Sequence, residues 1–132
     1  MKTTNLILYW AARIIASLIL LQTLFFKFTA ADESVEIFTR VGMEPWGRIG
    51  VGVLELVAAV FMLISATAWI GAGLALGLMA GAIVMHLTTL GISVQQDGGY
   101  LFFLAVAVSV CSVIILLMNK RKIIQLVRSF SG

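Results

Sequence analysis

The most regular feature of the chain is its alternation between long apolar runs and short polar segments. A helix needs about 20 residues to cross a hydrocarbon core of roughly 30 Å. Four runs approach that length, and we expect spanning helices at about residues 6–28, 46–64, 68–90 and 100–118. Only Ser65, Ala66 and Thr67 separate the second run from the third, and such short connections join antiparallel neighbours. The pattern predicts an all-α membrane protein, a four-transmembrane-helix antiparallel bundle forming one domain over residues 1–132.

Two of the polar segments carry amphipathic patterns. Within residues 29–44, Val35, Phe38 and Val41 recur at helical spacing among charged side chains, which predicts a short amphipathic helix on the membrane surface. From Asn119 onward, basic and apolar residues alternate in a way typical of an amphipathic C-terminal tail in the membrane interface. The remaining polar segment, residues 92–99, is expected to form a loop.

The first run has a second interpretation, because a secretory signal peptide also combines a basic start with an apolar stretch. Lys2 would supply the basic start, and the small residues at 29–31 would supply a cleavage site. Arg13 within the run and Lys27 directly before that site both argue against cleavage. We therefore expect a retained helix.

The distribution of Lys and Arg predicts the orientation, because cytoplasmic segments of membrane proteins carry the excess. The loop after the first run holds Arg40, with Lys27 and Arg48 at its edges. The terminal segments hold more, namely Lys2, Lys120, Arg121, Lys122 and Arg128. We expect a multi-pass membrane protein with both termini cytoplasmic and the helix within residues 29–44 on the opposite side of the membrane.

Composition agrees with this interpretation. Hydrophobic residues make up 61% of the chain and charged residues 11%, whereas soluble domains contain about 25% charged residues. The net charge of +3 would suggest nucleic acid in a soluble protein, but most basic residues lie at the ends of apolar runs. We expect membrane lipid and no nucleic acid as partners. Cys111 is the only cysteine, so an intrachain disulfide is excluded, and we expect it to act as a small apolar residue.

Ionisable residues within the runs are the candidate functional groups, because each costs about 2.5–3.5 kcal/mol to insert. Glu55 lies deepest, about 14 Å below the outer face at 1.5 Å per residue. Helical side chains lean toward the N-terminus, so Glu55 leans outward while Lys27 and His86, near the outer ends of their helices, lean inward. We expect these three to meet in a ligand or proton pocket in the outer half, with Arg48 as a further countercharge.

Plainer interpretations exist for each residue. Glu55 is as readily explained as a hydrogen bond between helices, and His86 as a side chain that reaches headgroup water. Lys27 and Arg48 are typical interfacial anchors, and Arg13 is expected to snorkel to the cytoplasmic face.

The third run contains Gly73, Gly77 and Gly81, a spacing that lets helices approach closely. We expect these glycines to serve packing, within the bundle or between protomers, on a face that points away from His86. The sequence contains no P-loop, dinucleotide fingerprint, metal-ligand cluster or nucleophile elbow, so we assign no catalytic residue and expect no metal site.

Several of these residues together resemble the pattern of the DoxX family of small four-helix bacterial membrane proteins. That family has an arginine in the first helix, a glycine-lysine at its end, a glutamate in a glycine-rich second helix and a histidine late in the third. The matching positions here are Arg13, Lys27, Glu55 and His86, with Pro45-Trp46 before the second run, while Phe26 stands where the glycine before the lysine is common.

The resemblance implies a location in the bacterial inner membrane, with the helix within residues 29–44 periplasmic. It also implies a link to quinone-linked oxidoreductases, including thiosulfate oxidation, or to thiol-redox complexes. Quinone is accordingly the candidate cofactor, and relatives that handle quinones through cysteine pairs are no guide because Cys111 is alone. The leading hypothesis is a subunit of a membrane oxidoreductase system that binds a quinone or another small hydrophobic molecule beside Glu55. The alternatives are a non-catalytic assembly or scaffold protein, working as a homo-oligomer or with a partner membrane subunit, and a small transporter subunit.

Overall fold

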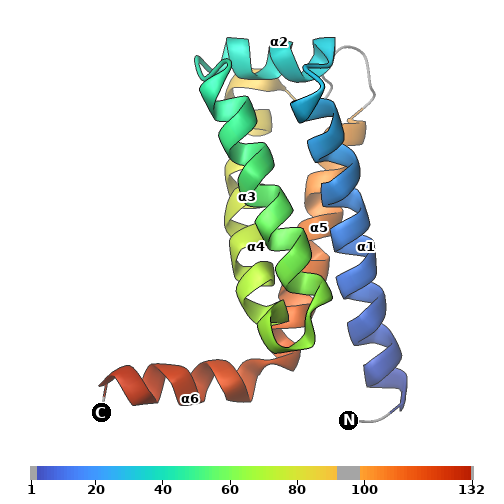
Figure 1. The fold of residues 1–132 in the computed structure, drawn as a ribbon, viewed down its shortest axis with the longest axis vertical. Helices are drawn as coiled ribbons and strands as arrows, with labels where there is room; N and C mark the ends of the chain where they lie inside the picture. The colour runs from blue at the N-terminus through green and yellow to red at the C-terminus, as the bar shows by residue number, and fades with distance from the viewer. Residues whose placement is uncertain (1–2, 92–98, 132) are drawn as a thin grey trace.

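The chain is described by a computed structural model over residues 3–91 and 99–131 (Figure 1). A short 3-10 turn, η1 (Ser65–Thr67), precedes the fourth helix and a π-helical turn, η2 (His86–Leu90), follows it. The helices are α1 (Thr3–Phe28), α2 (Asp32–Arg40), α3 (Trp46–Leu63), α4 (Ala68–Met85), α5 (Tyr100–Met118) and α6 (Lys120–Ser131).

Four segments of the described chain are long and apolar enough to cross a membrane. They match the expected spans to within three residues at each end, and they are Thr3–Phe28, Trp46–Leu63, Ser65–Leu90 and Tyr100–Met118. The prediction of an all-helical chain with four candidate spans is confirmed. The loop expected at 92–99 lies, except for Gly99, outside the described residues.

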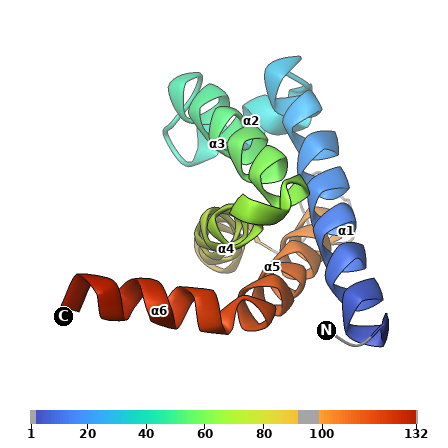
Figure 2. The ribbon, with the colours of Figure 1, turned by 60° about the horizontal axis from the view of Figure 1, so that its bottom comes forward.

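The four long helices form one bundle. In Figure 1 the chain rises along α1, descends along α3, rises along α4 and descends along α5. Each helix packs against two others: α1 and α4 each contact both α3 and α5. The view in Figure 2 shows the helices around a common interior, with α4 opposite α1. Residues far apart in the chain can therefore share one interior wall.

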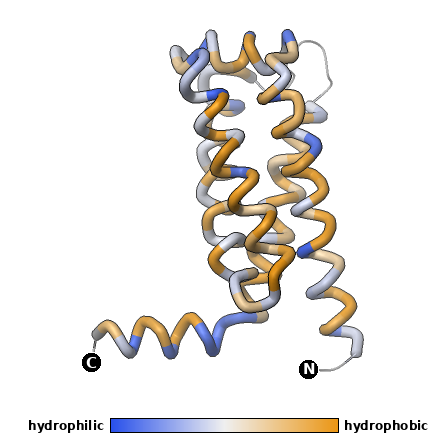
Figure 3. Tube along the Cα trace, viewed as in Figure 1, coloured by the Kyte–Doolittle hydropathy of each residue, from blue (hydrophilic) through white to orange (hydrophobic). Residues whose placement is uncertain are grey.

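Small side chains predominate in the interior of the bundle and large ones on its surface. Small residues at helix contacts are typical of helices that pack together in lipid. Its interior holds mainly alanines, such as Ala16, Ala58 and Ala72, together with Ser17 and Ser112. Large aliphatic and aromatic side chains point outward, among them Ile7, Leu18, Phe25, Leu87, Phe103 and Leu117. Figure 3 shows the outcome as long hydrophobic stretches along the bundle with few hydrophilic positions. This surface suits contact with membrane lipid.

Helix α2 lies across one end of the bundle (Figure 1). It contacts α1, α3 and η2, and it buries Ser34 and Phe38 on its inner face. On its outer side, Arg40 donates a hydrogen bond from Nη2 to the carbonyl of Thr89 at 3.1 Å. The amphipathic helix expected within residues 29–44 is thus present, and it closes this end of the bundle.

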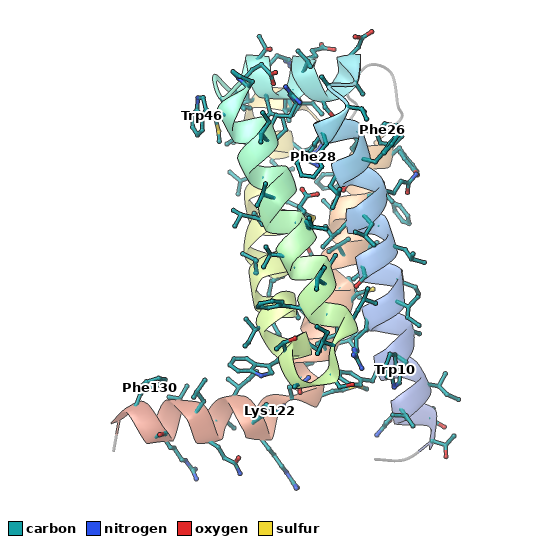
Figure 4. All side chains as sticks on the ribbon, viewed as in Figure 1. Trp10, Phe26, Phe28, Trp46, Lys122 and Phe130 are labelled. Carbon is teal, nitrogen blue, oxygen red and sulfur yellow. The ribbon has the colours of Figure 1, made fainter. Side chains whose placement is uncertain are left out.

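Helix α6 runs across the opposite end, where the chain turns sharply after α5 (Figures 1 and 2). Asn119 secures the turn by donating from Nδ2 to the hydroxyl of Tyr9 at 3.0 Å and to the carbonyl of Ile115 at 2.8 Å. Nitrogen-tipped side chains of α6 project away from the bundle, and Phe130 projects on the other side (Figure 4). The predicted amphipathic tail is therefore a regular helix with separate basic and apolar faces.

Candidate functional site

The half of the bundle beneath α2 contains a cavity of about 500 Å³. We call it the upper cavity. Its wall consists mostly of aliphatic, aromatic and methionine side chains from all four long helices, and Ile37 and Phe38 of α2 form its roof. The ionisable side chains in the wall are Lys27, Glu55 and His86, with Tyr100 at the start of α5. The cavity is a mainly apolar chamber with a few polar groups in its wall.

Glu55 forms a buried ion pair with Lys27 inside this wall. Lys27 lies in the last turn of α1, while Glu55 lies midway along α3 and is only 2% exposed. The ammonium Nζ lies 3.1 Å from Oε1 and 3.3 Å from Oε2 of the carboxylate. Thr23, one turn before Lys27, donates its hydroxyl to Oε2 at 3.0 Å. The expected meeting of Glu55 with a cation is present, and Thr23 is a partner that the sequence analysis missed.

His86 occupies another part of the same cavity wall. It opens the π-helical turn η2 and is 5% exposed, so it is packed inside the protein. Its Nδ1 lies 2.9 Å from the carbonyl of Gly91, and its ring meets Phe102 edge-on at 5.7 Å. Because a carbonyl only accepts, Nδ1 carries the hydrogen of this bond, and Nε2 of the neutral ring is then an acceptor. Among the described residues, no direct hydrogen bond joins His86 to Glu55.

Arg48 does not provide the countercharge that we expected. Its Nε donates to both carboxylate oxygens of Glu44, at 2.9 and 3.0 Å, and its Nη1 donates to the backbone carbonyl of Lys27. It does not line the upper cavity. The i, i+4 spacing from Glu44 was the sequence signal that could have revealed this pairing. Arg48 instead ties the start of α3 to the end of α1, and so it helps to position Lys27.

Arg13 also differs from expectation, because its side chain is fully buried rather than extended to the surface. Its Nε donates to the carbonyl of Met62 at 2.7 Å and its Nη2 to that of Leu63 at 2.9 Å. The guanidinium lies 3.9 Å from the ring centroid of Trp10. The last carbonyls of α3 have no hydrogen-bond donors within the helix. Arg13 provides donors for two of them. The expected snorkelling is wrong because these carbonyls satisfy the guanidinium within the protein.

The glycine ridge of α4 does not pack within the described bundle. Gly73, Gly77 and Gly81 are exposed, and a Cβ built on any of them would find nothing within 4 Å. The close helix contact is made by Gly71, where a Cβ would lie 2.6 Å from the carbonyl oxygen of Ala58. Packing within the bundle is thus wrong for the three predicted glycines.

The glycine ridge was expected to lie on a face of the helix that points away from His86. Gly77 and Gly81 nevertheless line the upper cavity together with His86. At 3.6 residues per turn, Gly77 and His86 are about half a turn apart around α4. They therefore occupy opposite margins of the broad surface that α4 presents to the cavity.

The chain was compared with known proteins, and no family model, no curated protein and no solved structure matches it. The chemistry of the site therefore has to be argued from its own residues.

The arrangement offers both hydrogen-bond donors and acceptors in an apolar chamber. The Lys27 ammonium donates, while the Glu55 carboxylate and Nε2 of His86 accept. Within the described residues no group of three or more His, Cys, Asp or Glu side chains could hold a metal ion. Cys111 is half-buried on α5 and does not line the cavity. The cavity wall thus offers hydrogen-bond partners to the oxygen atoms of a small, mainly apolar molecule.

Proposed function

We propose that the protein is a DoxX-like subunit of a bacterial inner-membrane oxidoreductase system that binds a quinone-like hydrophobic molecule in the upper cavity. The observation that carries this proposal is a mainly apolar cavity of about 500 Å³ with a buried ion pair in its wall. Ligand sites are typically chambers of 300–1,000 Å³ with a few well-placed polar groups. An ionised pair in hydrocarbon is costly, and its position beside open space favours a binding role over a purely structural one.

In the proposed orientation the bundle is antiparallel in the membrane, with α2 periplasmic and both termini cytoplasmic. The basic residues of α6 support it, since cytoplasmic segments carry the excess of Lys and Arg. Trp46 near the α2 end and Trp10 toward the other end are exposed and mark two interfacial levels (Figure 4). The upper cavity then lies in the periplasmic half of the bilayer.

The residues of the cavity fit an oxygen-bearing aromatic head. Lys27 would donate a hydrogen bond to a carbonyl oxygen, and Glu55 would accept one from a hydroxyl. Glu55 and His86 would hold and release protons, while the surrounding apolar side chains exclude water. A bound quinone supplies the capacity to carry two electrons and two protons, and the electrons would come from a partner subunit.

The direct test measures the binding of decylubiquinone to the purified protein in lipid nanodiscs by calorimetry. Glu55→Gln should abolish or strongly weaken binding, because it removes the acceptor charge that holds the head. Asp32→Asn is the matched control, since it removes the same charge from an exposed position outside the cavity. Equal binding by wild type, Glu55→Gln and Asp32→Asn would contradict the proposal.

A second candidate function, assembly of a membrane complex, is favoured by the open glycine ridge. Gly73, Gly77 and Gly81 leave a flat exposed strip on α4 that a helix of another subunit or a second copy could approach closely. Light scattering of the protein in mild detergent tests this candidate. Gly73→Phe should then lower the mass of the assembly, and an unchanged monomeric mass would exclude the ridge as a homo-oligomer contact.

A further inference from the structure

We propose that the upper cavity opens sideways into the lipid between α3 and α4, and that its ligand enters there while an apolar tail remains outside in the bilayer. This inference rests on the proposed function for the ligand and on geometry for the opening. It identifies the ligand as a molecule with a small polar head and an isoprenoid-like or acyl-like tail, taken up from the membrane rather than from water.

The first observation is that α3 and α4 are in close contact at the ends away from α2. A Cβ built on Gly71 would lie 2.6 Å from the carbonyl oxygen of Ala58 and 2.7 Å from the backbone nitrogen of Met62. Real side chains do not approach backbone atoms so closely, so the two helices nearly touch through their main chains. No molecule can pass between them at this level.

The second observation is that the cavity borders the same two helix faces two turns closer to α2. Leu78 follows Gly71 by seven residues and Val51 precedes Ala58 by seven, which is about two turns in each case. Both therefore project from the same helix faces that meet at Gly71, and at the same level, because the chain descends α3 and rises along α4 (Figure 1). Both line the upper cavity. The cavity thus reaches the two helix faces that meet at Gly71, at a level where side chains rather than main chains lie between α3 and α4.

The third observation concerns the outer edge of this space. Gly77 and Gly81 line the cavity and are themselves exposed, and a Cβ at either position would meet nothing within 4 Å. Within the described chain, Gly77 and Gly81 themselves carry no side chain that could close this flank of α4 between the cavity and the outside. Gly73 is equally exposed and equally open, but it lies one turn lower and does not line the cavity.

The side chains around the opening are apolar and suited to contact with lipid. Val53 and Leu54 on α3, near the level of Gly77, are exposed, and so is Val84 on α4, two turns closer to α2. The end of the cavity that faces away from the bundle is roofed by Ile37 and Phe38 of α2. Apolar molecules partition into hydrocarbon rather than water, so a lateral opening favours a membrane-dissolved ligand. A head beside Lys27 and Glu55 can then bind while its tail leaves between α3 and α4.

The kinetic test uses phenylalanine to fill the opening in the full-length protein in nanodiscs. Gly77→Phe and Gly81→Phe should slow both association and dissociation of decylubiquinone by about tenfold, leaving affinity nearly unchanged, because a barrier of about 1.4 kcal/mol is added to both directions. The quenching of tryptophan fluorescence is followed by stopped flow. Gly73→Phe is the matched control and should bind at the wild-type rate. The proposal would be overturned if Gly77→Phe and Gly81→Phe bound and released decylubiquinone at the same rates as Gly73→Phe.

A second measurement needs no ligand and so separates the opening from the proposed function. A spin label placed at Val51 in a Cys111→Ser background should collide frequently with oxygen, which dissolves in lipid, and rarely with a water-soluble nickel chelate. Gly77→Phe should lower the oxygen collision rate, and Gly73→Phe should not. Access of the nickel chelate equal to that of oxygen would show an opening to water and overturn the inference. Absence of quinone binding with this oxygen pattern intact would instead reject only the proposed function.

An assembly contact on the glycine ridge gives a different result again. It would make Gly73→Phe and Gly77→Phe behave alike, with a change of mass in both. That outcome would also overturn the lateral opening, because a helix seated on the ridge covers it.

Discussion

Lys27 and Glu55, 28 positions apart in the chain, place an ammonium 3.1 Å from a carboxylate oxygen between α1 and α3. Arg48 contributes to this geometry by bonding to the backbone carbonyl of Lys27, and Thr23 contributes by donating to the carboxylate. The ion pair is unequally sheltered, because Lys27 is 16% exposed and Glu55 is 2% exposed. Removing either partner should therefore have different consequences.

The first prediction concerns the stability of this pair. Lys27→Gln should lower the free energy of unfolding by about 3–5 kcal/mol, because it leaves a buried carboxylate unpaired. Glu55→Gln should cost less, since the Lys27 side chain already reaches the surface. The double variant should cost less than the sum of the two, which unfolding by denaturant in micelles would measure. Strict additivity would show that the two charges do not interact.

The second prediction concerns Arg13, which holds the end of α3. Arg13→Lys keeps the charge but loses the planar fork that reaches the carbonyls of Met62 and Leu63. Stability should fall by about 1–3 kcal/mol, the cost of leaving buried acceptors unsatisfied. Arg40→Lys is the control, because Arg40 is exposed and, within the described residues, its side chain donates to one carbonyl, that of Thr89. A melting temperature that falls equally in both variants would count against the capping role of Arg13.

The third prediction separates two glycines of α4. Gly71→Ala should destabilise the protein by about 1–3 kcal/mol, because the new methyl group overlaps the backbone of α3. Gly77→Ala meets open space and should be neutral or stabilising by up to about 1 kcal/mol, since alanine favours helix. Thermal unfolding followed by circular dichroism compares the two. The explanation fails if their order is reversed.

The fourth prediction is that Cys111 is dispensable. Its side chain is half-buried on α5 and does not line the upper cavity. Cys111→Ala and Cys111→Ser should leave the helical spectrum and decylubiquinone binding unchanged. A loss of activity with intact folding would point instead to thiol chemistry with a partner protein.

The fifth prediction is the topology. Reporter fusions at residue 66, in η1, and after residue 132 should both report the cytoplasm, whereas one in α2 should report the periplasm. Exposure of residue 66 to the periplasm would reverse the proposed orientation.

The spans were predictable from the sequence because their length is set by the thickness of the bilayer, whatever they pack against. The Lys27–Glu55 contact could also be predicted from the sequence, because helical side chains lean toward the N-terminus and the two helices run in opposite directions. Depth along a helix follows from counting residues.

The rotation of each helix about its axis and the local partners of its side chains were harder to predict from the sequence. Arg48 was misplaced because Glu44, in a segment taken as polar loop, competes for it from one turn away. Arg13 was misplaced because its acceptors are backbone carbonyls, which carry no sequence signal. The spacing of Gly73, Gly77 and Gly81 resembles that of a packing ridge, yet Gly71 makes the contact. Which stripe of α4 faces α3 depends on how four helices fill a shared interior.

The flat helices at the two ends of the bundle, α2 and α6, have a mechanical consequence in the proposed orientation (Figure 1). A spanning helix usually adapts to a bilayer of unsuitable thickness by tilting. Two crosswise amphipathic helices resist tilt, because tilting lifts part of each from its interface. The 18 residues of α3 cover about 27 Å, slightly less than an average hydrocarbon core. We therefore expect the bilayer to thin locally where it borders α3, the shortest of the four candidate spans in the described chain.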